Sequence, residues 1–148
     1  MKQQSTIKAK DIIYLDDYTI YFQIGKGGQS KVYYAKQNHN NERIALKVSN
    51  GDIFNNVFAK ETDFMAKIPD SPQILKKLSS LERANIDKKQ RVFYAMELAD
   101  EGNLQEYILF NDAPMPEFVI KYYSKQVLDS IEKVHNMGYC HNDLKLEN

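Results

Sequence analysis

Three runs rich in β-branched and aromatic residues follow one another within the first fifty residues, and short turns separate them. The runs cover residues 18–24, 31–36 and 44–48. Glycines interrupt the chain between the first two runs, and a polar Asn-His-Asn-Asn turn precedes the third. Connections this short join antiparallel neighbours. The chain is therefore predicted to open with a three-stranded antiparallel meander.

The chain then changes to helical periodicity. Apolar residues recur at helical spacing from Phe54 to Ile68, and Pro69 and Pro72 close the segment, which predicts one helix. Further along we expect strands at 74–86 and 91–98 and helices at 103–110 and between Pro116 and Gly138. The predicted fold class is α+β, with a five-stranded antiparallel sheet and one helix followed by further helices.

Composition narrows the classes of function. The 148 residues include 20 Lys and Arg against 20 Asp and Glu, so no broad basic field is available for nucleic acid or an anionic membrane. Cys140 is the single cysteine, which rules out an intrachain disulfide and fits a reducing compartment, the cytosol or the nucleus. We find neither a targeting segment nor an apolar run long enough to span a membrane.

The glycine-rich turn is the first candidate binding site. It reads Ile-Gly-Lys-Gly-Gly-Gln-Ser-Lys-Val over residues 24–32, and its glycines would let backbone amides approach phosphate oxygens. A strand rather than a helix follows it, and it lacks the Gly-Lys-Ser/Thr signature, so the dinucleotide-binding and Walker loops are disfavoured. An ordinary hairpin turn is the alternative interpretation of this motif.

A lysine and a glutamate occupy unusual positions. Lys47 shares a strand face with Ala45, and Glu61 interrupts the apolar stripe of the predicted helix. A carboxylate buried alone costs several kcal/mol, on the order of the penalty for any buried charge, so pairing of Glu61 with Lys47 is the simplest arrangement. The alternative is that both long side chains reach solvent from the edge of the helix and strand.

The last segment carries the most specific signal. His141-Asn-Asp-Leu-Lys-Leu-Glu-Asn148 resembles the catalytic loop of eukaryotic protein kinases, and Ile44-Ala-Leu-Lys47 resembles their strand with the ATP-binding lysine. Met96-Glu-Leu-Ala99 is similar to their gatekeeper and hinge. The resemblance covers residues 18–148, with residues 1–17 as a polar leader, 18–98 as the N-lobe and 99–148 as the hinge and the start of an incomplete helical C-lobe.

The resemblance implies a role for each matching residue. Contacts to ATP fall to the glycine loop, the lysine strand and the hinge: Ile24, Gly25, Lys26, Gly27, Gly28, Val32, Ala45, Lys47, Met96, Glu97 and Ala99. Asp143 would accept or orient the substrate hydroxyl, and Lys145 would neutralise the γ-phosphate. Glu61 would fix the ATP-binding lysine, and Asn148 would bind Mg²⁺. The implied cofactors are ATP and Mg²⁺.

Two departures qualify the resemblance. Asn142 stands where the family usually has arginine, so the chain resembles the non-RD kinases, and its loops are similar to those of the dual-specificity monopolar-spindle kinases. Nothing follows Asn148, so the Asp-Phe-Gly triplet and the activation segment of the family are not in this sequence. We therefore expect little activity from these residues alone, and a partner that covers the apolar face of the long helix.

The expected function is ATP-dependent phosphoryl transfer to Ser or Thr hydroxyls of proteins. Lys145, two residues after the aspartate, is typical of serine/threonine kinases. One alternative is a non-catalytic ATP-binding or scaffolding module similar to a pseudokinase. A second is a small-molecule kinase of the same fold, which the His-x-Asp-Leu-Lys spacing disfavours.

Overall fold

The computed structural model describes residues 12–111 and 113–147, and these residues form two compact units. The chain up to Pro69 joins Leu75–Leu98 in the first unit, and Asp70–Ile74 joins the chain from Ala99 onward in the second.

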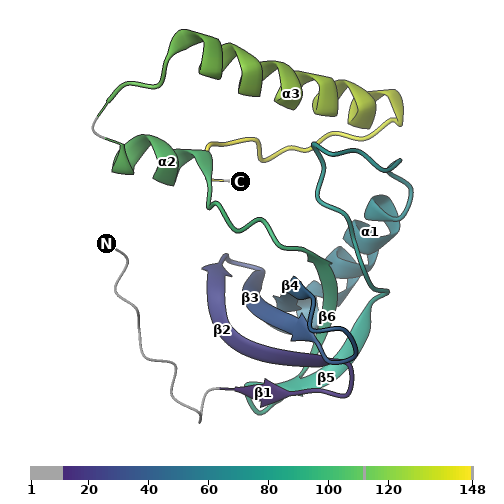
Figure 1. Cartoon of the computed structure of the whole chain (residues 1–148). Helices are drawn as coiled ribbons and strands as arrows, with labels where there is room; N and C mark the ends of the chain where they lie inside the picture. The colour runs from purple at the N-terminus through teal and green to yellow at the C-terminus, as the bar shows by residue number, and fades with distance from the viewer. Residues whose placement is uncertain (1–11, 112, 148) are drawn as a thin grey trace. The chain divides into compact units, whose positions relative to one another are not determined.

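A six-stranded antiparallel sheet forms most of the first unit (Figure 1). Its spatial order is β1-β2-β3-β4-β6-β5, and neighbouring strands are antiparallel throughout. The strands are β1 (Ile13–Tyr14), β2 (Tyr18–Lys26), β3 (Ser30–Gln37), β4 (Arg43–Ser49), β5 (Glu82–Ile86) and β6 (Lys89–Glu97). The predicted meander is confirmed as strands β2, β3 and β4.

The sheet differs from the prediction in two places. It has six strands rather than five, because Ile13 and Tyr14 in the predicted leader pair with Ile20 and Thr19 of β2. The strand predicted over residues 74–86 is wrong in its first half, where only Lys77 forms an isolated bridge with β6. The segment before β5 instead makes irregular contacts, in which the backbone amides at 78 and 79 both donate to the Ala95 carbonyl.

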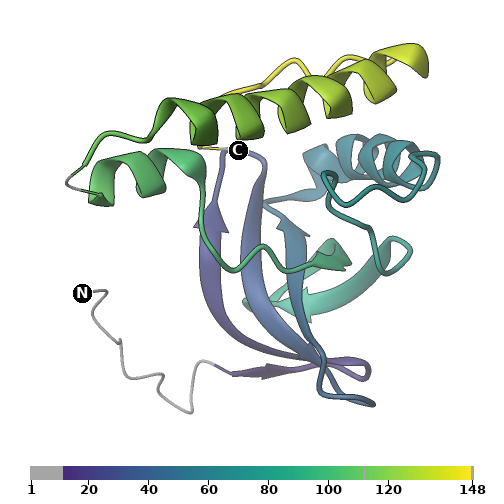
Figure 2. The ribbon, with the colours of Figure 1, turned by 45° about the horizontal axis from the view of Figure 1, so that its top comes forward.

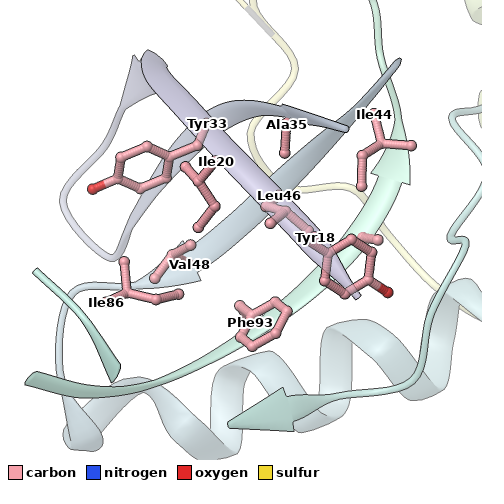
Figure 3. Packing of buried hydrophobic residues seen from close by; sticks show 10 residues of the cluster. Tyr18, Ile20, Tyr33, Ala35, Ile44, Leu46, Val48, Ile86 and Phe93 are labelled. Carbon is pink, nitrogen blue, oxygen red and sulfur yellow. The ribbon is translucent and has the colours of Figure 1, made fainter. Parts of the chain in front are cut away.

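One face of the sheet holds the larger core (Figure 3). Alternate residues of β4 point to this face, as the period of two along a strand requires, and β2, β3, β5 and β6 contribute their own inward side chains. The buried members are Tyr18, Ile20, Tyr33, Ala35, Ile44, Leu46, Val48, Ile86, Phe93 and Ala95. The intervening residues of β4, Ala45 and Lys47, must therefore face the opposite side.

Helix α1 (Asn55–Met65) packs on that opposite side, after a 3₁₀ turn over Asp52–Phe54. Phe58 is its central contact and is buried with Val92 and Tyr94 of β6. The predicted helix is confirmed, but it ends at Met65 rather than Ile68, because the next amides close a tight turn onto the carbonyls of the last helical turn. This packing carries Glu61 to the Lys47 face of the sheet.

The second unit contains the two predicted helices, α2 (Leu104–Phe110) and α3 (Glu117–Asn136), drawn in green in Figure 2. Asn103 caps α2, and its side-chain oxygen accepts from the backbone amide of Glu106 at 2.8 Å. After α3, Gly138 takes a left-handed conformation with φ of 79°. The chain then returns to α2, where the Leu146 carbonyl accepts from the Gln105 amide at 3.0 Å.

The helices of the second unit carry many exposed apolar side chains. Those more than three-fifths exposed are Leu109, Phe110, Phe118, Tyr122 and Leu128. A partner that covers this face remains a prediction. None of the helices in the described part of the chain combines the length and apolar character needed to cross a membrane.

Candidate functional site

A row of cross-strand neighbours on the α1 face defines the site in the first unit. Gly25 of β2 is paired with Val32 of β3, and Val32 is paired with Lys47 of β4. Lys47 is paired in turn with Tyr94 of β6. Paired residues on one sheet face lie close enough for their side chains to touch. The start of the glycine loop, a valine and the lysine therefore share one surface.

An ion pair joins this row to helix α1. Lys47 Nζ lies 2.5 Å from Glu61 Oε1, and the two side chains are 23% and 32% exposed. The ammonium group also lies over the ring of Phe58, 5.9 Å from its centroid. The interpretation that both side chains reach solvent separately is therefore wrong. A half-buried pair of this kind fixes the lysine in one place, while part of the lysine side chain stays exposed.

Tyr94 is a third member of this group, and no sequence motif marked it as a site residue. Its side chain is buried, and its hydroxyl interacts with the Glu61 carboxylate. Burial, and next the negative charge of Glu61, raise the pKa of Tyr94 far above its usual value, so the hydroxyl stays protonated. The ring packs edge to face on Phe58 at 5.9 Å. The alternation of strand 91–98 could have placed Tyr94 on the face opposite Phe93, but it does not set the register that pairs Tyr94 with Lys47.

The glycine loop closes with a tight turn. The Gly27 amide donates to the Ser30 carbonyl at 2.8 Å. Among the described glycines, only Gly102 and Gly138 have positive φ, so the backbone conformation does not require glycine at positions 25, 27 and 28. A Cβ at Gly28 would meet no atom within 4 Å. Internal packing does not require glycine there either, and a backbone without a Cβ is one that a ligand can approach closely.

Other predicted binding residues are distributed around this row. Ala45 is buried on β4 and paired with the half-buried Met96 of β6, one step along from the Lys47–Tyr94 pair. Glu97 ends β6, and its backbone amide donates to the Lys76 carbonyl at 2.9 Å. Two of the predicted loop contacts, Ile24 and Lys26, are exposed, and Ala99 belongs to the second unit.

The predicted catalytic residues lie in the second unit, on the segment after α3. Lys145 Nζ lies 3.0 Å from the Asp143 carboxylate, and both side chains are exposed. The Asp143 backbone amide points to His141 Nδ1 at 3.3 Å, so this nitrogen acts as the acceptor. Asn142 has φ of 61°, a left-handed conformation that asparagine tolerates better than most residues. The predicted metal ligand Asn148 lies outside the described residues.

The described residues do not form a metal cage of their own. They contain no cluster of three or more His, Cys, Asp or Glu side chains placed to hold an ion. Mg²⁺ is commonly bound through one or two protein groups together with the phosphates of a nucleotide. A site for Mg²⁺ in this chain would depend on the nucleotide that brings it.

A lysine–glutamate pair between a sheet strand and a helix, on the same face as a glycine loop, is the arrangement of the nucleotide-binding lobe of a protein kinase. Comparison with known proteins agrees. Residues 18–148 match the family described as Protein kinase domain. The chain belongs to this family.

Several of the similar curated proteins are named serine/threonine-protein kinases. The chain is 31% identical over 139 residues to the probable serine/threonine-protein kinase fhkA of Dictyostelium discoideum. It is 27% identical over 143 residues to the testis-specific serine/threonine-protein kinase 3 of Mus musculus. These matches cover 90% and 94% of this chain but 23% and 52% of the relatives.

A solved structure supports the fold. The kinase domain of PknI from Mycobacterium tuberculosis superposes with a TM-score of 0.69 at 22% identity. The match covers 92% of this chain and 55% of that chain. The α+β fold predicted from the sequence is therefore confirmed as protein-kinase-like.

Proposed function

We propose that this chain contributes the ATP-binding and catalytic-loop residues of a protein kinase that phosphorylates Ser or Thr hydroxyls. The observation that carries the proposal is the half-buried Lys47–Glu61 pair, which holds an ammonium group on the same sheet face as the glycine loop. In this proposal residues 18–98 form the nucleotide-binding lobe, and residues 99–148 begin the lobe that binds the protein substrate.

Each charged group has a task that suits phosphoryl transfer. The reaction passes through a loose transition state, so the protein mainly positions groups and neutralises charge. Lys47 would bind the α- and β-phosphates while Glu61 and Tyr94 hold it in place. Asp143 would orient the substrate hydroxyl and accept its proton, and Lys145 would neutralise the γ-phosphate.

The remaining assignments concern the nucleotide and its metal. Val32 and Ala45 present small apolar surfaces on the site face and would enclose the adenine, while Met96 would border it as the gatekeeper. The hinge backbone at Glu97 and Ala99 would bind the adenine edge. Mg²⁺ would supply further charge neutralisation when bound with ATP, with Asn148 as the protein group assigned to it.

The proposal also covers the acceptor residue, the class of substrate and the cellular compartment. Lys145 supports Ser/Thr rather than Tyr acceptors, and the serine/threonine kinases among the relatives support the same choice. The balanced charge of the chain supports a protein substrate rather than nucleic acid or a membrane surface. Cys140 is a free, exposed thiol, which is compatible with the reducing cytosol or nucleus.

The test is phosphotransfer from Mg-ATP to three peptides that differ only in a central Ser, Thr or Tyr. Wild type is compared with Asp143→Asn, and ATP binding is measured on both proteins in parallel. Transfer to the Ser and Thr peptides that Asp143→Asn abolishes, with ATP binding unchanged, supports the proposal. Binding without transfer by these 148 residues is expected for both functions, so it supports the non-catalytic module only if a longer chain that includes an Asp-Phe-Gly segment also fails to transfer phosphate. Transfer to Tyr alone contradicts the assigned specificity.

A further inference from the structure

One side chain ties the glycine loop to the end of strand β4. Asn50 follows β4, and its side-chain amide donates to the carbonyls of Gly27 and Gly28, both at 2.9 Å. Its backbone amide donates to the Gln29 carbonyl, also at 2.9 Å. Three successive carbonyl groups of the loop are therefore hydrogen-bonded to one residue.

Asn50 is itself held from the other side. The guanidinium group of Arg91, near the start of β6, donates through Nη1 to the Asn50 carbonyl. Both Asn50 and Arg91 are half-buried, which limits competition from water for this contact. The loop is thus fixed through Asn50 to a strand in the interior of the sheet.

Because of the geometry of the peptide bond, the hydrogen bonds from Asn50 to the loop carbonyls also set the direction of the neighbouring backbone amides. In a trans peptide the carbonyl of one residue and the amide of the next point in opposite directions. Since Asn50 binds the carbonyls of Gly27 and Gly28, the amides of Gly28 and Gln29 point away from Asn50. Consecutive amides that face one way form a concave anion site.

We propose that Asn50 is a positioning residue that orients the Gly28 and Gln29 amides toward the phosphates of ATP. This inference rests on the proposed function, because it assumes that the loop binds a nucleotide. Without the clamp the loop would sample other orientations, and binding would have to order it at a cost in affinity. The cost should fall on ligands with phosphates and not on the nucleoside.

The chain contains a matched control in Asn38. Its side-chain amide also donates to two successive carbonyls, those of Leu15 and Asp16, at 2.8 and 2.9 Å. These bonds join the β1–β2 turn to the turn after β3, at the other end of these strands from the glycine loop. Asn38→Ala therefore removes the same kind of contact without touching the loop.

The first arm of the experiment measures the affinity of the full 148-residue chain for Mg-ATP and for adenosine by calorimetry. Asn50→Ala is expected to raise the Kd for Mg-ATP about tenfold, as expected for the loss of two ordinary hydrogen bonds, and to change that for adenosine less than about twofold. Asn38→Ala should change neither Kd. Equal losses for both ligands in Asn50→Ala, or no loss for Mg-ATP, would overturn the positioning role.

The second arm measures amide hydrogen exchange without ligand. Asn50→Ala should speed exchange at the Gly27 amide, which is bonded within the loop, while Asn38→Ala should not. Unchanged exchange in Asn50→Ala would overturn the clamp. If wild type binds neither ligand, the proposed function and the positioning role fail together, and the exchange data still decide whether Asn50 orders the loop.

Discussion

Replacement of Tyr94 by phenylalanine should weaken both the fold and the nucleotide site. The change removes only the hydroxyl that interacts with the Glu61 carboxylate, and the ring keeps its contact with Phe58. A hydrogen bond to a charged group typically contributes about 1.5–3 kcal/mol. Glu61 is about one-third exposed and can regain water, so we expect a loss of about 1–2 kcal/mol in the free energy of unfolding.

The first assay is thermal unfolding of the wild type and the variant. For a chain of this size, each 1 kcal/mol corresponds to about 2–4 °C in Tm, so Tyr94→Phe should unfold about 2–8 °C earlier. A double-mutant cycle with Glu61→Gln isolates the pair, and its interaction energy should be about 1 kcal/mol. No loss of stability, or purely additive effects in the cycle, would refute the role given to the hydroxyl.

A matched control is available at Tyr18. This tyrosine is also buried, its hydroxyl donates to the Glu82 carboxylate at 3.2 Å, and its ring packs edge to face on Phe93 at 5.9 Å. Tyr18→Phe should lower the Tm by a similar amount without changing ATP affinity. Tyr94→Phe should in addition raise the Kd for Mg-ATP about threefold, corresponding to roughly half of a 1.4 kcal/mol, tenfold step, because Glu61 holds Lys47 less firmly. Equal affinities in the two variants would contradict the link.

Three further predictions address other parts of the chain. Lys31 donates to Asp87 and lowers the pKa of this carboxyl. The pair therefore stabilises the fold above the pKa that Asp87 has in the unfolded chain, and this stabilisation is lost as the pH falls through the lower pKa of the folded chain. Asp87→Asn should lower the free energy of unfolding in urea by about 0.5 kcal/mol at pH 7, and this loss should vanish at low pH. Asn103→Ala should destabilise α2 by about 1 kcal/mol, measured by amide exchange, and equal exchange would argue against the cap. Gly28→Ala should leave Tm unchanged and weaken ATP binding. Gly138→Ala, at positive φ, should lower Tm by about 2–4 °C. The reverse pattern would contradict a binding role for Gly28 and a conformational role for Gly138.

Local patterns in the sequence predicted a large part of this structure. The alternation of Ile44, Leu46 and Val48 placed Lys47 on the face opposite the core, and the helical stripe placed Glu61 toward the sheet. Together the two placements predict the Lys47–Glu61 ion pair, because a buried charge needs a partner of opposite charge. The glycine loop was also predicted, although neither positive φ nor crowding around the backbone requires glycine at its positions 25, 27 and 28.

Features that depend on strand register could not be predicted in the same way. Tyr94 reaches Glu61 only because β6 lies beside β4 with Tyr94 opposite Lys47, and no local pattern sets that register. Asn50 looks like an ordinary polar residue after a strand until the loop carbonyls are placed around it. The two-residue strand β1 is too short for alternation to be detected, so it was assigned to the leader.

The most direct test of the central claim is Mg-ATP binding to wild type and Lys47→Met by calorimetry, with Lys31→Met as the control. Lys31 is also an ion-paired lysine on the sheet, 2.8 Å from Asp87 and 33% exposed, but it pairs with the β5–β6 turn rather than with α1. We expect saturable binding by wild type and Lys31→Met and loss of binding in Lys47→Met. Equal binding by all three proteins would show that the Lys47–Glu61 pair does not form the nucleotide site.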